Sequence, residues 1–210
     1  MLKTLLVAGC LAICILPLKT ANFQAEHPSA TAIDADVDAI YSAVIDWRTA
    51  HPGEGPKAGQ LVLLDTTEKY SCFGSEAADC TAKTRNQLTG MFGKDMDLRT
   101  IDDYMERNAE KKALSKTIPT TLAKSYITEA EQSALFKKGV GKGWQAFYAK
   151  YPKAGGIIGF SQIGFNENHD RALLYSSIGC GGLCGTGHYH FLRKENGRWI
   201  LAANSMVWIS

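Results

Sequence analysis

Apolar residues recur at helical spacing in one stretch near the start of the chain. They fall at i, i+3, i+4, i+7 and i+8, and they are Val37, Ile40, Tyr41, Val44 and Ile45. This spacing predicts an amphipathic helix with one buried face. Asp34 and Asp36 are suited to capping the start of the helix, and the His-Pro-Gly sequence at 51–53 ends it.

The pattern between residues 60 and 125 is weaker. A short apolar run at 60–65 predicts a strand, and residues 84–92 and 100–114 predict helices, of which the second is charged on most sides. We expect residues 33–125 to form an N-terminal helix, a short strand and a helical connection. That connection is predicted to be a surface layer or a partly ordered segment.

Two further helices are predicted after residue 127. Thr128 and Glu131 form a capping box, in which each side chain bonds the backbone amide of the other residue, and the helix it opens ends near Lys138. The next helix ends at Pro152. It carries a stripe of aromatic residues, Trp144, Phe147, Tyr148 and Tyr151. Four large rings on one stripe need a sheet to cover them, so we interpret the stripe as a core face rather than as a ligand-stacking surface.

Four runs rich in β-branched and aromatic residues follow, at 157–165, 172–178, 187–194 and 199–208. The Asn196-Gly197 pair suits a type I′ hairpin turn. Short connections between successive strands imply an antiparallel meander. The predicted fold class is therefore α+β, with helices packed on a four-stranded antiparallel meander sheet. We expect this C-terminal unit at 126–210 to form one compact domain with the part that precedes it.

The first 25 residues differ from the rest and predict a signal peptide. Lys3 precedes an apolar run at 5–18, and small and polar residues follow, as in the three regions of a secretory signal. The run is too short to span a bilayer. The alternative cleavage sites follow Ala21, Ala25 and Ala32. We expect a periplasmic or secreted protein, and a lipoprotein with its lipid on Cys10 or an uncleaved anchor remain as alternatives.

Composition and charge narrow the class of protein. The 210 residues are 45% hydrophobic and 21% charged, which is typical of a globular chain and excludes a disordered, collagen-like or coiled-coil protein. Removal of Lys3 and Lys19 with the signal leaves 21 basic residues against 21 acidic ones. This balance lacks the attraction on which binding to nucleic acids and anionic membranes depends. We expect neither as a partner, unless a lipid on Cys10 anchors the chain.

The expected oxidation state of the cysteines follows from the predicted compartment. Removal of the signal leaves Cys72, Cys80, Cys180 and Cys184, an even number that indicates disulfides in an oxidising compartment. Local pairing, of Cys72 with Cys80 and of Cys180 with Cys184, needs no assumption about the fold. A cross-link between the two halves of the chain is the alternative.

Residues 179–187 hold five glycines around the second cysteine pair, and three interpretations compete. The glycines supply positive φ angles to a tight loop that the cysteines close, their amides form a nest for an anion or ligand, or the two thiols form a redox pair. We favour the structural loop. The candidate ligand-binding residues of this loop are Gly181, Gly182, Gly185 and Gly187.

His188 and His190 lie two positions apart in the third predicted strand, so their side chains share a face. With a third donor, such as His169 or a thiolate, they are candidates for a zinc or copper site. Tyr189 and Phe191 supply the buried alternate face. We therefore expect the histidines on an exposed polar face, with no bound metal or other cofactor.

The last third of the chain combines an aromatic helix, a glycine-rich turn and a tryptophan-serine end. The positions are Trp144, Phe147, Tyr148, Tyr151, Pro152, Gly156, Phe160, Ser161, 164–166, Ala172, Leu173, Tyr175, 180–185, Gly187, Tyr189, Gly197, Trp199 and 208–210. In these positions the chain resembles a group of uncharacterised bacterial exported proteins. The resemblance implies an exported α+β protein and transfers no catalytic residue.

A catalytic set is not evident in the sequence. The glycine-serine run at 159–164 departs from a nucleophile elbow, because its second glycine comes one residue late. We expect a disulfide-stabilised, non-catalytic binding or inhibitory module of the bacterial envelope, with an envelope protein or a small ligand as partner. Such a module predicts an apolar or glycine-walled concavity beside 179–187.

The alternative is a thiol- or histidine-dependent hydrolase or oxidoreductase that uses Cys180 or Cys184 with His188 or His190. An enzyme of this kind predicts a pocket in which a cysteine, a histidine and an acid lie within hydrogen-bond reach.

Overall fold

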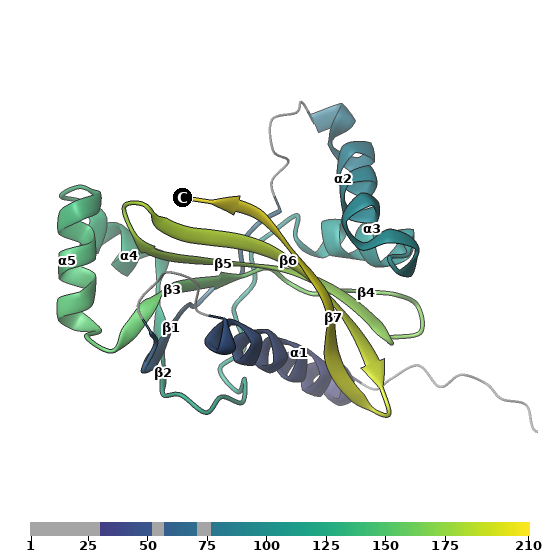
Figure 1. Ribbon diagram of the computed structural model, residues 1–210, viewed down its shortest axis with the longest axis horizontal. Helices are drawn as coiled ribbons and strands as arrows, with labels where there is room; N and C mark the ends of the chain where they lie inside the picture. The colour runs from purple at the N-terminus through teal and green to yellow at the C-terminus, as the bar shows by residue number, and fades with distance from the viewer. Residues whose placement is uncertain (1–29, 52–56, 71–76) are drawn as a thin grey trace, which may run out of the picture.

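The computed structural model describes residues 30–51, 57–70 and 77–210, without the side chains of 30–33 and 77–79 (Figure 1). The signal peptide predicted at 1–25 lies outside these ranges. The helices are α1 (Ala30–Ala50), α2 (Ala77–Phe92), η1 (Gly93–Asp95), α3 (Leu98–Arg107), α4 (Glu129–Phe136) and α5 (Val140–Lys150). The strands are β1 (Gln60–Leu64), β2 (Lys124–Ile127), β3 (Ala154–Phe160), β4 (Gly164–Phe165), β5 (Arg171–Gly181), β6 (Cys184–Glu195) and β7 (Arg198–Ile209).

The strands form one mixed sheet in the order β2-β1-β3-β5-β6-β7, with β4 paired to β5. The predicted antiparallel meander is present as β3, β5, β6 and β7. The prediction of a four-stranded antiparallel sheet is wrong in extent, because β1 lies between β2 and β3 and is parallel to both. Parallel strands are joined by long connections, so no local turn signal marks their pairing. The fold is a mixed α/β arrangement with five α-helices and seven strands in the described ranges.

Helix α1 covers one face of the sheet (Figure 1). It begins earlier than predicted, at Ala30, and its predicted apolar stripe is buried except for Val37, which is partly buried. Ile40 and Val44 pack in one core cluster with Leu174 and Leu192 of the sheet. This stripe fixes which side of α1 faces the strands, and it thereby fixes where the last turn of the helix places its polar residues.

Helices α2 and α3 cover part of the opposite face (Figure 1). Ile101 and Tyr104 are buried there against Leu173 and Phe191. The helix predicted at 100–114 therefore has a buried side, and it ends at Arg107 rather than at Leu114. The two faces of the sheet carry alternate residues of β5 and β6, as the two-residue period of a strand requires.

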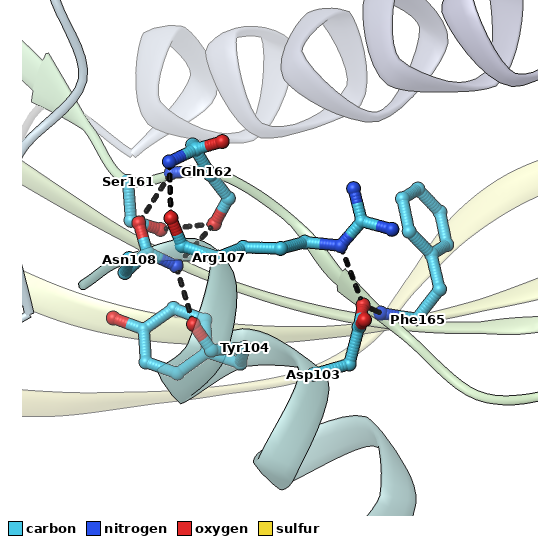
Figure 2. A network of polar contacts seen from close by, with 7 residues as sticks. All are labelled: Asp103, Tyr104, Arg107, Asn108, Ser161, Gln162 and Phe165. Carbon is cyan, nitrogen blue, oxygen red and sulfur yellow. Dashed lines mark hydrogen bonds and ion pairs between the residues drawn. The ribbon is translucent and has the colours of Figure 1, made fainter. Parts of the chain in front are cut away.

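A network of polar contacts attaches the end of α3 to the sheet (Figure 2). Asn108, fully buried, donates from Nδ2 to the carbonyl oxygens of Tyr104 (2.8 Å) and Gln162 (3.0 Å), and its Oδ1 accepts from the Gln162 amide at 2.7 Å. Asp103 accepts from the Phe165 amide at 2.8 Å. Because the Asn108 side chain bonds the last turn of α3, it ends the helix there and satisfies three backbone groups of a buried connection.

Helices α4 and α5 cover the other part of the second face, beside β1, β2 and β3. One of the two hydrogen bonds of the predicted capping box is present, in which Thr128 Oγ1 accepts from the Glu131 amide at 3.0 Å. The aromatic stripe of α5 is a core face as predicted, with Phe147 buried and Trp144 packed against the same cluster. The Tyr148 hydroxyl donates to the Cys180 carbonyl oxygen at 2.8 Å, so α5 also holds the end of the β5–β6 hairpin.

Candidate functional site

A cavity of about 530 Å³ lies between the last turn of α1 and the part of the sheet that ends in the β5–β6 turn. Most of its wall is apolar and includes Leu61, Ile158, Ile178, Met206 and Ile209. Its size lies within the range of small-molecule binding sites. We call it the hairpin cavity. No aspartate or glutamate side chain of the described residues lines it.

Arg48 is the buried cation of the hairpin cavity. It follows Val44 and Ile45 by one helical turn, so it lies on the buried side of α1, and only 9% of it is exposed. Its Nε donates to Ser176 Oγ at 2.8 Å, and its Nη2 donates to the Ser176 carbonyl oxygen at 2.9 Å. Burial lowers the pKa of Arg48 to about 10, which leaves the guanidinium charged at neutral pH.

Two histidines of β6 lie next to this cation. Ser176 Oγ and His190 Nε2 share a hydrogen bond of 2.6 Å, which continues the chain of contacts from Arg48 into the sheet. Burial, with the Arg48 charge and His188, lowers the pKa of His190 to about 2. Burial and the Arg48 charge also lower the pKa of His188. Both imidazoles are therefore neutral at pH 7, and Arg48 carries the positive charge of this cluster.

Aromatic rings of α1 and β6 form one side of the hairpin cavity. The Trp47 and His51 rings are stacked with centroids 5.1 Å apart, and the Trp47 ring meets His188 edge-on at 5.4 Å. His51 directly follows the end of α1, and its Nδ1 lies 2.8 Å from the Trp47 carbonyl oxygen. Trp47, His51 and His188 all line the cavity, so its wall offers flat aromatic surface beside the aliphatic residues.

The β5–β6 hairpin closes the cavity on another side and carries the predicted disulfide. Cys180 and Cys184 are bonded to each other, as local pairing predicts. The prediction of a nine-residue loop at 179–187 is wrong, because strand pairing continues through these residues and leaves only Gly182 and Leu183 as the turn. Leu183 is 91% exposed and also lines the cavity. Cys72 lies outside the described residues, so its predicted pairing with Cys80 stays a prediction.

The glycines of this hairpin provide room rather than unusual backbone angles. The glycines with positive φ in the described ranges are Gly93, Gly139, Gly156 and Gly197. The expectation of positive φ within 179–187 is therefore wrong. A Cβ atom at Gly187 would overlap the Trp208 indole and the Tyr175 hydroxyl, whose atoms Nε1 and OH form a hydrogen bond of 2.6 Å across the strand.

The candidate ligand-binding loop is only partly at the cavity. Gly185 lines it, whereas Gly181, Gly182 and Gly187 do not. The interpretation of the loop as a nest of free amides loses its basis, because the strands pair through this segment.

The expected exposed face for the two histidines is wrong. His190 is fully buried and His188 is partly buried, because α1 covers this face of the sheet. Their rings are stacked with centroids 5.9 Å apart. His169 lies elsewhere, in the β4–β5 connection against Phe165. Across the described ranges, no three or more His, Cys, Asp or Glu side chains gather in a way that could hold a metal ion.

Sequence reasoning missed several residues of the cavity wall. Arg48 was readable from the helical pattern, since it is a charged residue at the next position of an otherwise apolar stripe. Trp47 and Met206 gave no such signal, because only the packing of α1 on the sheet brings both of them to the cavity.

Comparisons with known proteins add no relative. No protein-family model matches the chain, and no curated protein and no solved structure matches it significantly. In the part of the chain that the structure describes, no helix has both the length and the apolar character to cross a bilayer.

Proposed function

We propose that this protein binds a small apolar ligand in the hairpin cavity, as a non-catalytic binding or inhibitory module exported to the bacterial envelope. The cavity is the observation that carries the proposal. Its volume of about 530 Å³ and its largely apolar wall suit a small organic molecule. The Cys180–Cys184 disulfide and the Tyr148 hydrogen bond hold the hairpin side of the wall, which favours a preformed site.

The enzymatic alternative has weaker support. A thiol-dependent mechanism needs a thiolate, and the sulfur atoms of Cys180 and Cys184 are bonded to each other. A histidine-dependent mechanism needs an accessible imidazole oriented by an acid. His190 is fully buried, and the cavity wall within the described ranges contains no aspartate or glutamate side chain beside His188.

Export rests on the pattern of residues 1–25, on the disulfide and on the resemblance to bacterial exported proteins. Disulfides persist in oxidising compartments, so the Cys180–Cys184 bond supports an extracytoplasmic location. N-terminal sequencing of protein from the envelope fraction tests this part of the proposal. A chain that starts between residues 22 and 33 supports a cleaved secretory signal, and a lipidated Cys10 at the new terminus supports a lipoprotein.

Ligand binding is tested with N-phenyl-1-naphthylamine, a neutral apolar probe whose fluorescence increases in an apolar environment. We expect saturable binding of one probe per chain to the unaltered protein. Ala58→Trp places an indole at the cavity wall and should abolish this binding. Ala149→Trp, the same substitution at an exposed position of α5, is the matched control and should leave it unchanged.

Two results contradict the proposal. One is a folded protein that shows no saturable binding of the probe. The other is equal binding by the Ala58→Trp and Ala149→Trp variants, which would place the probe outside the hairpin cavity.

A further inference from the structure

We propose that the ligand of the hairpin cavity is an amphipathic anion, with an apolar body and one carboxylate that binds Arg48. This inference rests on the proposed function and names the ligand class. It follows from a buried positive charge that forms no ion pair with a carboxylate of the described residues.

Arg48 forms no ion pair with a described residue, whereas four arginines with exposed side chains do. The arginines that pair with carboxylates in the described ranges have side chains that are 40–44% exposed, and they are Arg85, Arg107, Arg171 and Arg193. Arg48 is far more buried, yet no carboxylate of the described chain lies within 4.0 Å of its guanidinium. A buried charge is costly unless it is paired, so an anion that enters the cavity is favoured at this position.

The orientation of Arg48 leaves donors for a ligand. A guanidinium has five N–H groups, and the two bonds to Ser176 use one on Nε and one on Nη2. Ser176 is itself held by His190, so the guanidinium is fixed before a ligand arrives. The remaining donors on Nη1 and Nη2 match the two oxygens of a carboxylate, which arginine binds with higher specificity than lysine does.

The surroundings of Arg48 leave its guanidinium charged and without an ion pair. The charge of Glu68 raises the pKa of Arg48, but Glu68 accepts a hydrogen bond from Ser177 Oγ at 2.6 Å and forms no ion pair with Arg48. His188 and His190 are neutral at pH 7, because burial and Arg48 hold their pKa values low.

The other residues of the cavity wall favour a ligand with an apolar body. Leu61, Ile158 and Ile178 offer aliphatic surface, and Trp47 offers an aromatic ring. A small inorganic anion would leave this surface in contact with water, whereas an aliphatic or aromatic chain would cover it. The site therefore fits an organic acid with an apolar body rather than a free phosphate or a sugar.

A series of ligands with one chain length and different head groups tests the charge. Isothermal titration calorimetry at pH 7.5 would measure octanoate, octan-1-ol and octylamine against the unaltered protein. We expect octanoate to bind about 10- to 100-fold more tightly than octan-1-ol, because a hydrogen-bonded charge pair contributes on that scale. Octylamine, with its positive charge beside Arg48, should bind most weakly.

Two matched variants test whether Arg48 causes the preference for octanoate over octan-1-ol. Arg48→Met removes the charge and keeps an apolar side chain of similar length, so the preference for octanoate over octan-1-ol should be lost while octan-1-ol still binds. Arg99→Met removes the same charge from an exposed position of α3 and should keep the preference. The ligand series on the unaltered protein remains a complete test if Arg48→Met does not fold.

The outcomes separate this inference from the proposed function. If octan-1-ol binds as tightly as octanoate, or if Arg48→Met keeps the preference, the role of Arg48 is overturned and an apolar binding site remains. If neither octanoate, octan-1-ol nor the neutral probe binds, the proposed function and the inference both fail.

Discussion

Replacement of the buried His190 by glutamine should reduce the loss of stability that the protein suffers in mild acid. The His190 side chain is fully buried and its pKa is lowered from 6.5 to about 2, first by burial and then by Arg48 and His188. The folded state therefore leaves this imidazole neutral where the unfolded chain protonates it. The stability that the neutral form contributes is present above about pH 6.5 and is lost as the pH falls toward the folded-state value.

The size of the effect follows from the two pKa values. With the folded imidazole neutral throughout, the unfolded chain gains enough protonation between pH 7 and pH 5 to remove about 2 kcal/mol of unfolding free energy. Below that range the loss continues at about 1.4 kcal/mol for each pH unit until the folded imidazole also titrates. His190→Gln has no titrating group at this position, so its stability should fall by that much less between pH 7 and pH 5.

Urea unfolding, followed by tryptophan fluorescence at pH 5, 6 and 7, gives the unfolding free energy of both proteins. The two proteins differ in how this free energy changes with pH, and that difference is the contribution of His190, because all other titrating groups are shared. NMR of the imidazole carbons provides a second readout, in which His190 should remain neutral at pH 5. Parallel loss of stability in the two proteins, or a His190 resonance that titrates near pH 6.5, would refute the reasoning.

Three further substitutions probe the hairpin and the end of α3. Loss of the disulfide in Cys180→Ser with Cys184→Ser should lower the unfolding free energy by about 2 kcal/mol, the chain-entropy value for so short a loop, and an unchanged urea midpoint would contradict this. Gly187→Ala should cost about 1–3 kcal/mol because its methyl group overlaps the side chains that cross the strand, whereas Gly182→Ala, where the nearest atom is 3.9 Å away, should be close to neutral in thermal unfolding. Asn108→Ala should cost about 2–3 kcal/mol in urea unfolding, because buried backbone groups lose their partners, and a loss below 0.5 kcal/mol would show that water replaces the side chain.

The elements that local signals specify were predictable from the sequence. The stripe of α1 and the aromatic stripe of α5 both identify buried helix faces. Asn196 and Gly197 both have positive φ, 50° and 77°, as a type I′ turn requires. Each of these features depends on residues within a few positions of one another, so the sequence displays it directly.

Features that depend on distant packing were not predictable. The strand β2 has four residues and gave no pattern, and β1 reads as an isolated strand until β2 and β3 pair with it. His190 has the same alternation as an exposed residue, because the sequence does not reveal that α1 covers its face of the sheet. The cavity itself was expected beside 179–187, but its cation, Arg48, comes from a helix far away in the sequence.

The position of β1 has a consequence for how the chain folds. Gln60 pairs with Ala154 on one side, and Leu61 pairs with Lys124 on the other, so β1 acquires its neighbours only after most of the chain has been made. Until then a strand of five residues, three of them buried in the final structure, has both edges open. Parallel pairing between such distant segments slows folding and exposes the chain to aggregation. A factor that shields residues 60–64 during synthesis should therefore raise the yield of folded protein.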